Sequence, residues 1–462
     1  VRLQSDGKAN PAGINAWFLN KSFRFCPSCG VEYNVRSSEF RKLCGLNSEG
    51  RSSATTTISL SLLRKLLTFP DQEIQDNAKK LLAFSDNRQD ASLQSGHFND
   101  FLRVLQLRAG LLAALSKAGE KELSIETLAE ATEKALMLDS NDFISTKNVK
   151  PPIERNNRKA LRRVLEYRLI VDLRKGWRVT NPNLETLNLL EIDYAELVNC
   201  VEDNKDWENQ HPLLARASSI ERFLICHRIL EELRERLAID CEALSQEEFE
   251  RRKRAASDLE DTWSIGSDEK PEITRTIVTS PLPPKKKAAG VESLSIKGAF
   301  GRWFKARERW LSIEDQYLTY KWNDDLYQAV IGDIFTLMEA WGLVKRSEVQ
   351  LGQRDTEVLK GWQLAGTCLR WILIEPDKEP DDKYAIALIE ERKRYGRRGP
   401  GNDYFKYLYQ DLSELISDEG KPSFQTLNAR EHTAQVDAIE RENREEAFRK
   451  ASLRLMFCSP TM

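Results

Sequence analysis

The chain has 462 residues, 40% of them apolar, which is long enough for roughly two to four domains with their own cores. Lys and Arg total 70 against 72 Asp and Glu, for a formal net charge of −2. The overall charge therefore does not indicate a nucleic-acid binder, and any such binding must be local. No apolar run approaches the roughly 20 residues that cross a bilayer, so we predict no membrane segment.

The cysteines and the chain ends suggest where the protein works. The 8 cysteines are scattered through the sequence without a leader peptide, which fits a reducing compartment better than a disulfide scaffold. We therefore expect a cytoplasmic protein. Neither Val1 nor the run before Met462 looks like a natural terminus, so we expect an internal piece of a longer chain.

Residues 46–115 predict a helix and then a strand followed by a second helix. The apolar spacing over residues 58–67 is helical and ends before Pro70. Residues 79–84, with the letters KKLLAF, predict a buried strand. The sequence Ser85-Asp86-Asn87 is a cap signal, so the second helix is expected from about Arg88. This segment therefore predicts a unit of an α/β domain.

Residues 116–200 and 295–375 predict two winged-helix-like modules. In the first, a basic helix over residues 153–167 precedes strands at 169–173 and 177–179, which a basic turn connects. The second module repeats this order, since a helix over residues 326–341 is again followed by two strand-like segments. Both return strands begin with a Gly-Trp pair, which suggests that the two modules are related.

The remaining segments connect and follow these modules. Residues 201–255 predict long charged helices, and residues 256–294 are poor in periodic apolar positions, so we predict a flexible linker there. Residues 376–424 predict a basic loop and a helix. Residues 425–462 predict a charged helix through Phe448 and then a second buried strand with the letters LRLMFC.

Two separated stretches resemble motor motifs of superfamily 2 helicases. Residues 80–91 (KLLAFSDNRQDA) resemble motif IV of DEAD/DEAH-type enzymes, where a strand and a turn open the second RecA-like lobe. Residues 432–448, with the letters HTAQ at their start, resemble the helix before motif V, and residues 455–462 (LMFCSPTM) resemble the opening of that motif. The matching helix residues are His432, Arg441, Arg444, Glu445 and Phe448. The Glu-Leu-Gly and the Asp that would continue motif V are absent here.

The resemblance implies an α/β RecA-like partial lobe, interrupted by a mainly α-helical insertion with winged-helix-like α+β modules. The two stretches should then form adjacent strands of one parallel sheet, with Leu82 and Met456 in neighbouring strands. Large bacterial helicases of antiphage defence, of the DISARM type, and DNA-repair helicases are the enzymes that the arrangement resembles most.

Small polar residues follow both predicted strands. A helix N-terminus after a buried strand presents unpaired N–H groups and the positive end of a dipole, so Ser85, Asn87 and Arg88 are candidates to hold a nucleic-acid phosphate. The resemblance implies that Ser459 and Thr461 also contact the strand. The alternative is that Ser85 and its neighbours only cap a helix, and that Arg88 is a surface residue paired with an acid.

The chemistry of ATP hydrolysis is missing from the sequence. The phosphate loop Gly-x-x-x-x-Gly-Lys-Ser/Thr does not occur, and neither does an Asp-Glu-x-His site for Mg²⁺. We therefore assign no catalytic residue. ATP and Mg²⁺ would be held mostly by sequence outside this chain, and the chain alone should not hydrolyse ATP.

Residues 1–45 contain a zinc-knuckle-like pair, Cys26 and Cys29, whose turn directs both thiolates at one metal. Because Zn²⁺ takes four ligands, zinc binding requires further cysteines, either before Val1 or, less favourably, Cys44. The alternative is a pair of ordinary thiols on a turn. The other cysteines lie in apolar contexts and are expected in the core: Cys200, Cys226, Cys241, Cys368 and Cys458.

A basic run at residues 392–399 (RKRYGRRG) predicts a second nucleic-acid contact. It combines cations with an aromatic ring and flexible glycines, so Arg394, Arg397 and Arg398 are candidates to bind a phosphate strand. A solvated loop is the alternative. The basic turns of the two winged modules also have two interpretations, because such folds bind either DNA backbones or proteins.

These observations lead to one main hypothesis and one rival. We expect a fragment of an ATP-dependent DNA helicase or translocase, with DNA and the proteins of a defence or repair complex as partners. The fragment would supply strand-gripping surfaces and an accessory insertion. The rival is a non-catalytic winged-helix and zinc-knuckle module that binds nucleic acid or protein.

Overall fold

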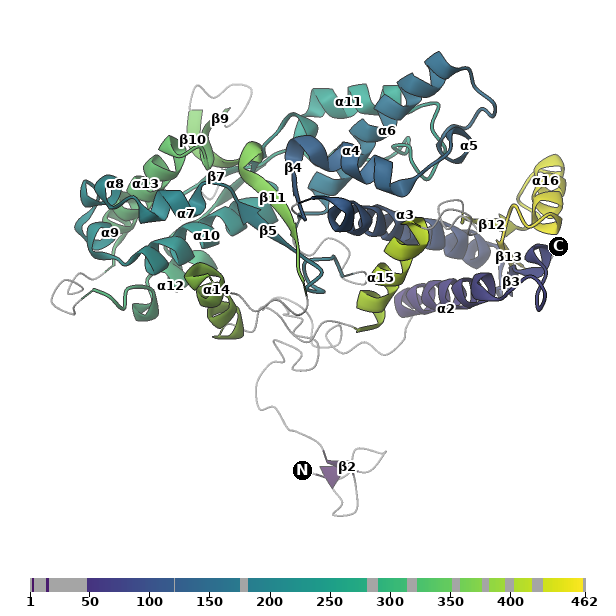
Figure 1. The fold of residues 1–462 in the computed structure, drawn as a ribbon, viewed down its shortest axis with the longest axis horizontal. Helices are drawn as coiled ribbons and strands as arrows, with labels where there is room; N and C mark the ends of the chain where they lie inside the picture. The colour runs from purple at the N-terminus through teal and green to yellow at the C-terminus, as the bar shows by residue number, and fades with distance from the viewer. Residues whose placement is uncertain are drawn as a thin grey trace.

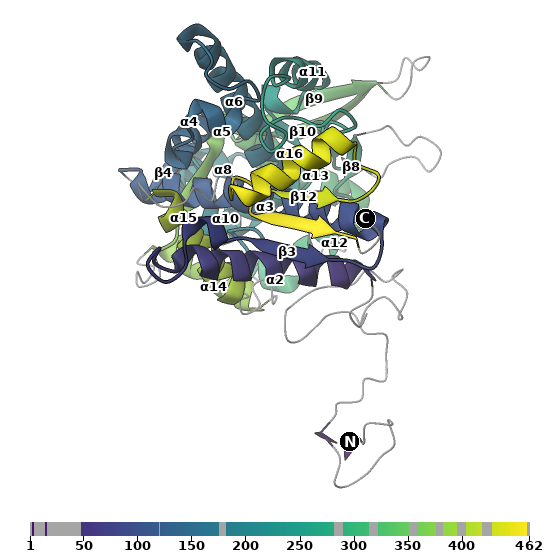
Figure 2. The ribbon, with the colours of Figure 1, turned by 90° about the vertical axis from the view of Figure 1, so that its right-hand side faces the viewer.

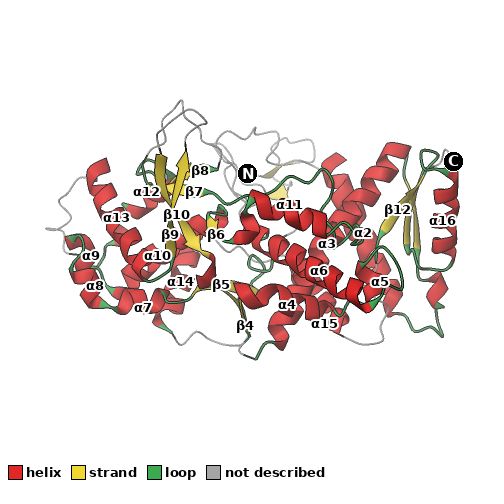
Figure 3. Ribbon diagram, turned by 90° about the horizontal axis from the view of Figure 1, so that it is seen from above, coloured by secondary structure: helices red, strands yellow, loops and turns green. Residues whose placement is uncertain are grey.

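The protein is described here from a computed structural model. The structure describes residues 2–3, 14–15, 48–119, 121–174, 182–280, 290–313, 322–350, 358–375, 382–394, 403–417 and 427–459. Helices and small sheets alternate through these residues, so the chain is a mixed α/β protein (Figure 3). The molecule is elongated, with a three-stranded parallel sheet near one end and the largest sheet toward the other (Figure 1). In the described part, no helix is long and apolar enough to cross a membrane.

The three-stranded sheet brings together two parts of the chain that are far apart in the sequence. Its strands are β3 (Leu81–Phe84), β12 (Ala429–His432) and β13 (Leu455–Cys458), in the order β12-β13-β3. All are parallel, and Met456 is the register partner of Leu82. Figure 2 shows the three strands side by side. The prediction that these stretches form adjacent parallel strands is confirmed.

Helices lie on both faces of this sheet. Helices α2 (Ser48–Thr68) and α3 (Arg88–Lys117) lie on one face, and α16 (Ala438–Arg449) lies on the other (Figure 2). Side chains alternate between faces along a strand, so Leu455 and Phe457 enter the main core while Met456 and Cys458 pack in a small cluster with α16. Leu82 and Phe84, on the same face of β3, remain 40% and 66% exposed. Helix α16 therefore does not cover β3, and the prediction of a buried strand there is correct for one face only.

Helix α3 carries the chain from the sheet into the rest of the molecule. Its 30 residues correspond to about 45 Å at 1.5 Å per residue, and its second half is buried on nearly all sides. Gly110 sits where α4 (Ile125–Leu136) crosses, and a Cβ there would lie 2.8 Å from Leu136. The close crossing of α3 and α4 thus depends on a residue without a side chain.

In its described residues, the chain between α4 and β12, called the insertion below, contains six longer helices, of which α6 and α15 pack against α3 and α4. These are α6 (Pro151–Val171), α10 (Ser219–Glu235), α11 (Gln246–Ala255), α13 (Asp324–Ala340), α14 (Lys383–Arg394) and α15 (Asp403–Ser417). Short helices connect them: α5 (Ser140–Phe143), α7 (Leu197–Glu202), α8 (Asn204–Glu208), α9 (Pro212–Arg216) and α12 (Ala299–Phe304). Single 3-10 turns are η1 (Asp76–Ala78), η2 (Glu242–Leu244), η3 (Arg307–Arg309) and η5 (Gly366–Cys368).

Two further sheets lie mainly within the insertion. The antiparallel sheet β4-β11-β5 joins β4 (Glu122–Ser124), β5 (Leu190–Tyr194) and β11 (Leu369–Leu373). The larger sheet contains β6 (Ile239–Asp240), β7 (Thr276–Val278), β8 (Val291–Ser293), β9 (Val344–Gln350) and β10 (Val358–Ala365). A small pair, β1 (Arg2–Leu3) and β2 (Ile14–Asn15), is separate from both.

The two predicted winged modules have different outcomes. The strand expected over residues 169–173 is wrong, because α6 continues through Val171. Its last turn is buried all round, from Tyr167 to Val171, and a short apolar run of this kind looks the same in a buried helix and in a buried strand. In the second module, α13 is followed by the antiparallel hairpin β9–β10, as expected, and Trp362 stacks on Phe335 with ring centroids 4.9 Å apart.

The segment predicted as a flexible linker differs from that expectation where the structure describes it. Residues 256–280 and 290–294 contain β7 and β8, and Trp263 and Ile277 are buried. The buried residues are spaced irregularly because the segment crosses several elements, so no helical or strand period marks them. Residues 281–289, which carry the Pro-Lys run, lie outside the described ranges.

Candidate functional site

The carboxyl edge of the parallel sheet gathers the polar residues that follow its strands. His432, Cys458 and Phe84 are aligned in register at the ends of β12, β13 and β3. Thr433, Ser459 and Ser85 therefore come next at one edge. In open parallel sheets, ligands bind outside the carboxyl ends of the strands, so this edge is the candidate site.

Ser85 joins the two strands at this edge. Its backbone nitrogen donates a 2.9 Å hydrogen bond to the Cys458 carbonyl oxygen, and its hydroxyl donates over 3.2 Å to the carbonyl oxygen of Asn87. The half-buried side chain therefore fastens the turn between β3 and α3. Its oxygen still has acceptor capacity, since a hydroxyl carries two lone pairs.

Asn87 is the N-cap of α3. Its side-chain oxygen accepts a 2.8 Å hydrogen bond from the backbone nitrogen of Asp90, and its amide donates to the Asp90 carboxylate over 3.0 Å. The capping interpretation of this turn is thus correct for Asn87. Asn87 and Arg88 are both exposed, so the positive end of the 30-residue helix faces solvent beside the sheet edge.

Ser459 and Thr433 lie behind this exposed turn. Both side chains are fully buried, so they line the inner part of the edge and do not present a surface to an external strand. Thr461, the other residue expected here, lies outside the described residues. Thr433 was not among the predicted site residues, although the signal was present: like Ser85 and Ser459, it is a hydroxyl residue directly after a strand.

The residues that resemble the helix before motif V are held together at the same sheet. His432 Nε2 lies 2.8 Å from the Glu445 carboxylate on α16, and Arg444 donates a 2.6 Å hydrogen bond to the Glu431 carbonyl oxygen. His432 is buried, and its Nδ1 has no hydrogen-bond partner among the described residues. These contacts fix α16 against the outer strand β12.

Lys80 connects β3 with the far end of α16. Its ammonium lies 4.9 Å from the centre of the Phe448 ring and donates hydrogen bonds to the carbonyl oxygens of Phe448, at 2.8 Å, and Arg449, at 3.2 Å. A cation that satisfies the last carbonyls of a helix is favourable. Residues from the two motif-like stretches therefore touch through side chains as well as through the sheet.

The predicted basic contact at residues 392–399 lies elsewhere. Arg394 ends α14, and nothing is described of its side chain, while Arg397 and Arg398 lie outside the described residues. Helix α14 packs against α10, away from the parallel sheet (Figure 1). This run and the sheet edge are thus separate features.

The predicted metal half-site also lies outside the residues that the structure describes. Cys26, Cys29 and Cys44 all fall in residues that the structure does not describe. In the described ranges, no group of three or more His, Cys, Asp or Glu side chains could hold a metal ion. The remaining cysteines are buried or half-buried free thiols, as expected, and burial raises the pKa of Cys200, Cys241 and Cys368 to about 12.

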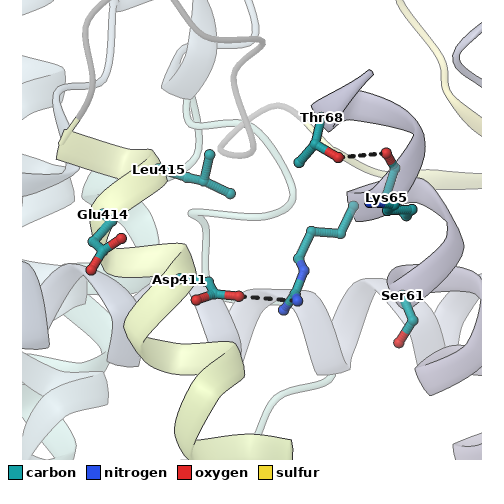
Figure 4. Close-up of a pocket in the computed structure, with 7 residues that line it drawn as sticks. Ser61, Lys65, Thr68, Asp411, Glu414 and Leu415 are labelled. Atoms are coloured by element: carbon teal, nitrogen blue, oxygen red, sulfur yellow. Dashed lines mark hydrogen bonds and ion pairs between the residues drawn. The ribbon is translucent and has the colours of Figure 1, made fainter. Parts of the chain in front are cut away.

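A cleft of about 420 Å³ lies between α2 and α15 (Figure 4). Its lining residues are Ser61, Arg64, Lys65 and Thr68 on α2 and Asp411, Glu414 and Leu415 on α15. Arg64 and Asp411 form a 3.0 Å ion pair across it. Because its two cations face two carboxylates, the cleft has no net charge to attract a phosphate, and we do not assign it a ligand.

Comparisons with known proteins add no relatives to this description. No family model matches the chain. No curated protein and no solved structure matches it either. The interpretation of the site therefore depends on its own residues and geometry.

Proposed function

We propose that this chain is part of the second RecA-like motor lobe of an ATP-dependent helicase or translocase that acts on DNA. The observation that carries the proposal is the parallel pairing of β3 with β13, which sets Ser85 and Ser459 at one sheet edge. A short strand, a polar turn and an exposed helix N-terminus together form an arrangement that suits a phosphate. A winged-helix and zinc-knuckle module would not require this sheet.

In this proposal the sheet edge grips the nucleic-acid backbone. The exposed N-terminus of α3, with Asn87 and Arg88, would meet a phosphate, and Ser85 would hold the turn in place. Such contacts position a strand without reading its sequence. In this proposal ATP and its metal are bound mostly by sequence outside this chain, and we derive no hydrolytic step here.

The contacts of α16 suggest how the edge could respond to ATP binding. His432–Glu445 and Arg444–Glu431 join α16 to β12, and Lys80 joins α16 to β3. The strands and α16 would therefore move as one body. A shift of this body relative to an ATP-binding lobe would displace the Asn87 turn along the strand.

The experiment compares the wild-type chain with Arg88→Ala by measuring affinity for single-stranded DNA as a function of salt. Loss of one phosphate contact should flatten the slope of log affinity against log salt by about 0.7. It should weaken binding equally for all sequences. Arg449→Ala, at a position that is 74% exposed on α16, is the matched control and should leave the slope unchanged.

The outcomes separate the proposal from its rival. An unchanged slope for Arg88→Ala would mean that this turn does not contact the strand. In a longer chain that includes an ATP-binding lobe, the same substitution should also lower DNA-stimulated ATP hydrolysis. A drop in the unfolding midpoint equal to that of a core variant would instead identify Arg88 as a structural residue.

A further inference from the structure

Helix α6 carries two rows of cations with different surroundings. Arg158 and Arg162 face α4, where carboxylates meet them: Arg158 lies 2.6 Å from Glu133, and Arg162 lies 3.1 Å from the same side chain. A further carboxylate, Glu130, lies 3.6 Å from Arg162. This first row is thus neutralised within the protein.

The second row consists of Arg155, Lys159 and Arg163, at positions i, i+4 and i+8 of α6. All three side chains are exposed. None of them has an ion pair or a side-chain hydrogen bond with another described residue. The two carboxylates that α6 itself carries near the row are engaged elsewhere, Glu154 with Arg158 and Glu166 with Arg252.

Such a row is unfavourable for the helix alone. Like charges four residues apart destabilise a helix, and the row contains two such pairs. The fold supplies carboxylates to the adjacent row and none to this one within the described part. An external anion would remove the repulsion.

The spacing of the row indicates what kind of anion fits. Four residues advance a helix by about 6 Å, so the three cations follow a ridge inclined by about 26° to the helix axis and span about 12 Å along it. Successive phosphates of one strand advance by about 3.4 Å each along the axis of duplex DNA, so a row of this length can lie against several phosphates of one backbone. Protein interfaces are centred on buried aromatic or apolar anchors, and the row contains none.

We infer that Arg155, Lys159 and Arg163 of α6 form a contact for the phosphate backbone of duplex DNA, separate from the sheet edge. Helix α6 lies in the insertion, beside α4 and α11 and away from β3 and β13 (Figure 1). The identification of the polymer as DNA rests on the proposed function, while the anionic contact rests on the row itself. The row would hold the duplex while the sheet edge holds a single strand.

The test measures affinity of the chain for a mixed-sequence DNA duplex at several salt concentrations. The variant Arg155→Gln/Lys159→Gln/Arg163→Gln should lower the slope of log affinity against log salt by about 2 to 3, because each phosphate contact contributes about 0.9. At low salt, its affinity should fall at least about tenfold. The matched control removes three exposed lysines outside α6, Lys205→Gln/Lys297→Gln/Lys360→Gln, and should keep the wild-type slope.

Several results would overturn the inference. The inference fails if the wild-type chain does not bind duplex DNA, or if the triple variant keeps the wild-type salt slope. It also fails if the control variant loses as much of the salt slope as the triple variant does. Loss of binding to anionic lipid vesicles or to an acidic polypeptide, with duplex binding intact, would assign the row to another partner. The unfolding midpoint of the variant should not fall, since all three side chains are exposed.

Single-stranded DNA separates this inference from the proposed function. If Arg88→Ala leaves single-strand binding unchanged while the triple variant loses duplex binding, the sheet-edge proposal fails and the α6 contact stands. The reverse pattern retains the sheet edge and rejects the α6 contact. The single variant Arg158→Gln, whose cation is paired internally, should leave the duplex slope at the wild-type value.

Discussion

The backbone nitrogen of Ser85 donates a 2.9 Å hydrogen bond to the carbonyl oxygen of Cys458, although 373 residues separate the two positions. The bond joins the turn after β3 to the end of β13. Everything between them, from α3 to α16, must therefore return the chain to the same sheet. The insertion is accommodated because α3 leaves the sheet as a long helix, and α4, α6 and α15 pack against it.

Replacing Asn87 by Ala should lower the free energy of unfolding by about 1 kcal/mol, because the variant loses the side-chain cap on the Asp90 nitrogen. Asn87→Ser retains a capping oxygen and should stay within a few tenths of a kcal/mol of the wild type. Urea denaturation of the three proteins measures the difference. Equal losses in the two variants would show that the cap does not stabilise α3.

Replacing Lys80 by Met should loosen the C-terminal end of α16. The substitution keeps much of the apolar stem but removes the donor that satisfies the carbonyl oxygens of Phe448 and Arg449. We expect faster amide hydrogen exchange over residues 446–453, with a loss of about 1 kcal/mol in local stability. Lys450→Met, at a position that is 69% exposed, is the control, and exchange unchanged in both would contradict the role of Lys80.

The local parts of the fold were predictable from the sequence, because short-range patterns determine them. The strand, cap and helix at residues 81–88 follow from an apolar run and an Asn before a helical period. The burial of Ser459 was not predictable, since it depends on strands from opposite ends of the chain. The pairing of Arg158 and Arg162, in contrast to the exposed row beside them, depends on where α4 packs, and no pattern within α6 reveals it.

Arg108 links three helices that the sequence does not associate. Its guanidinium is fully buried and bonds both oxygens of Asp172, at 2.9 and 2.7 Å, and the Tyr409 hydroxyl at 3.0 Å. Burial opposes its charge, but the Asp172 carboxylate and Tyr409 outweigh burial, so the pKa of Arg108 is raised. The group stays charged, and α3, α6 and α15 are joined through it.

Arg108→Met should therefore destabilise the chain by about 3 kcal/mol, because the carboxylate of Asp172, which is only 13% exposed, would lose its cation. The double variant Arg108→Met/Asp172→Leu should recover part of this loss, since no isolated charge remains. Urea denaturation gives the free energies, and Arg155→Met is the exposed control. The explanation would be contradicted if the double variant lost more stability, relative to the wild type, than the two single variants lose together.

His227 on α10 gives the protein a predictable pH dependence. Its ring is buried, in edge contact with Tyr194 and beside Phe223, with centroids 5.6 and 5.7 Å away. Burial lowers its pKa to about 4. The Glu231 carboxylate opposes this shift, and the cations Arg392, Arg234 and Arg228 add to it.

The unfolded chain binds a proton at His227 below about pH 6.5, whereas the folded protein does so only near pH 4. Stability from this group is therefore fully present above pH 6.5 and is lost as pH falls toward 4. Between pH 7 and pH 5 the loss amounts to about 2 kcal/mol. His227→Gln removes the titrating group, so the difference in unfolding free energy between wild type and variant should shrink by that amount over this range. Urea denaturation at both pH values measures this change. A difference that stays constant with pH would show that His227 does not titrate as its burial requires.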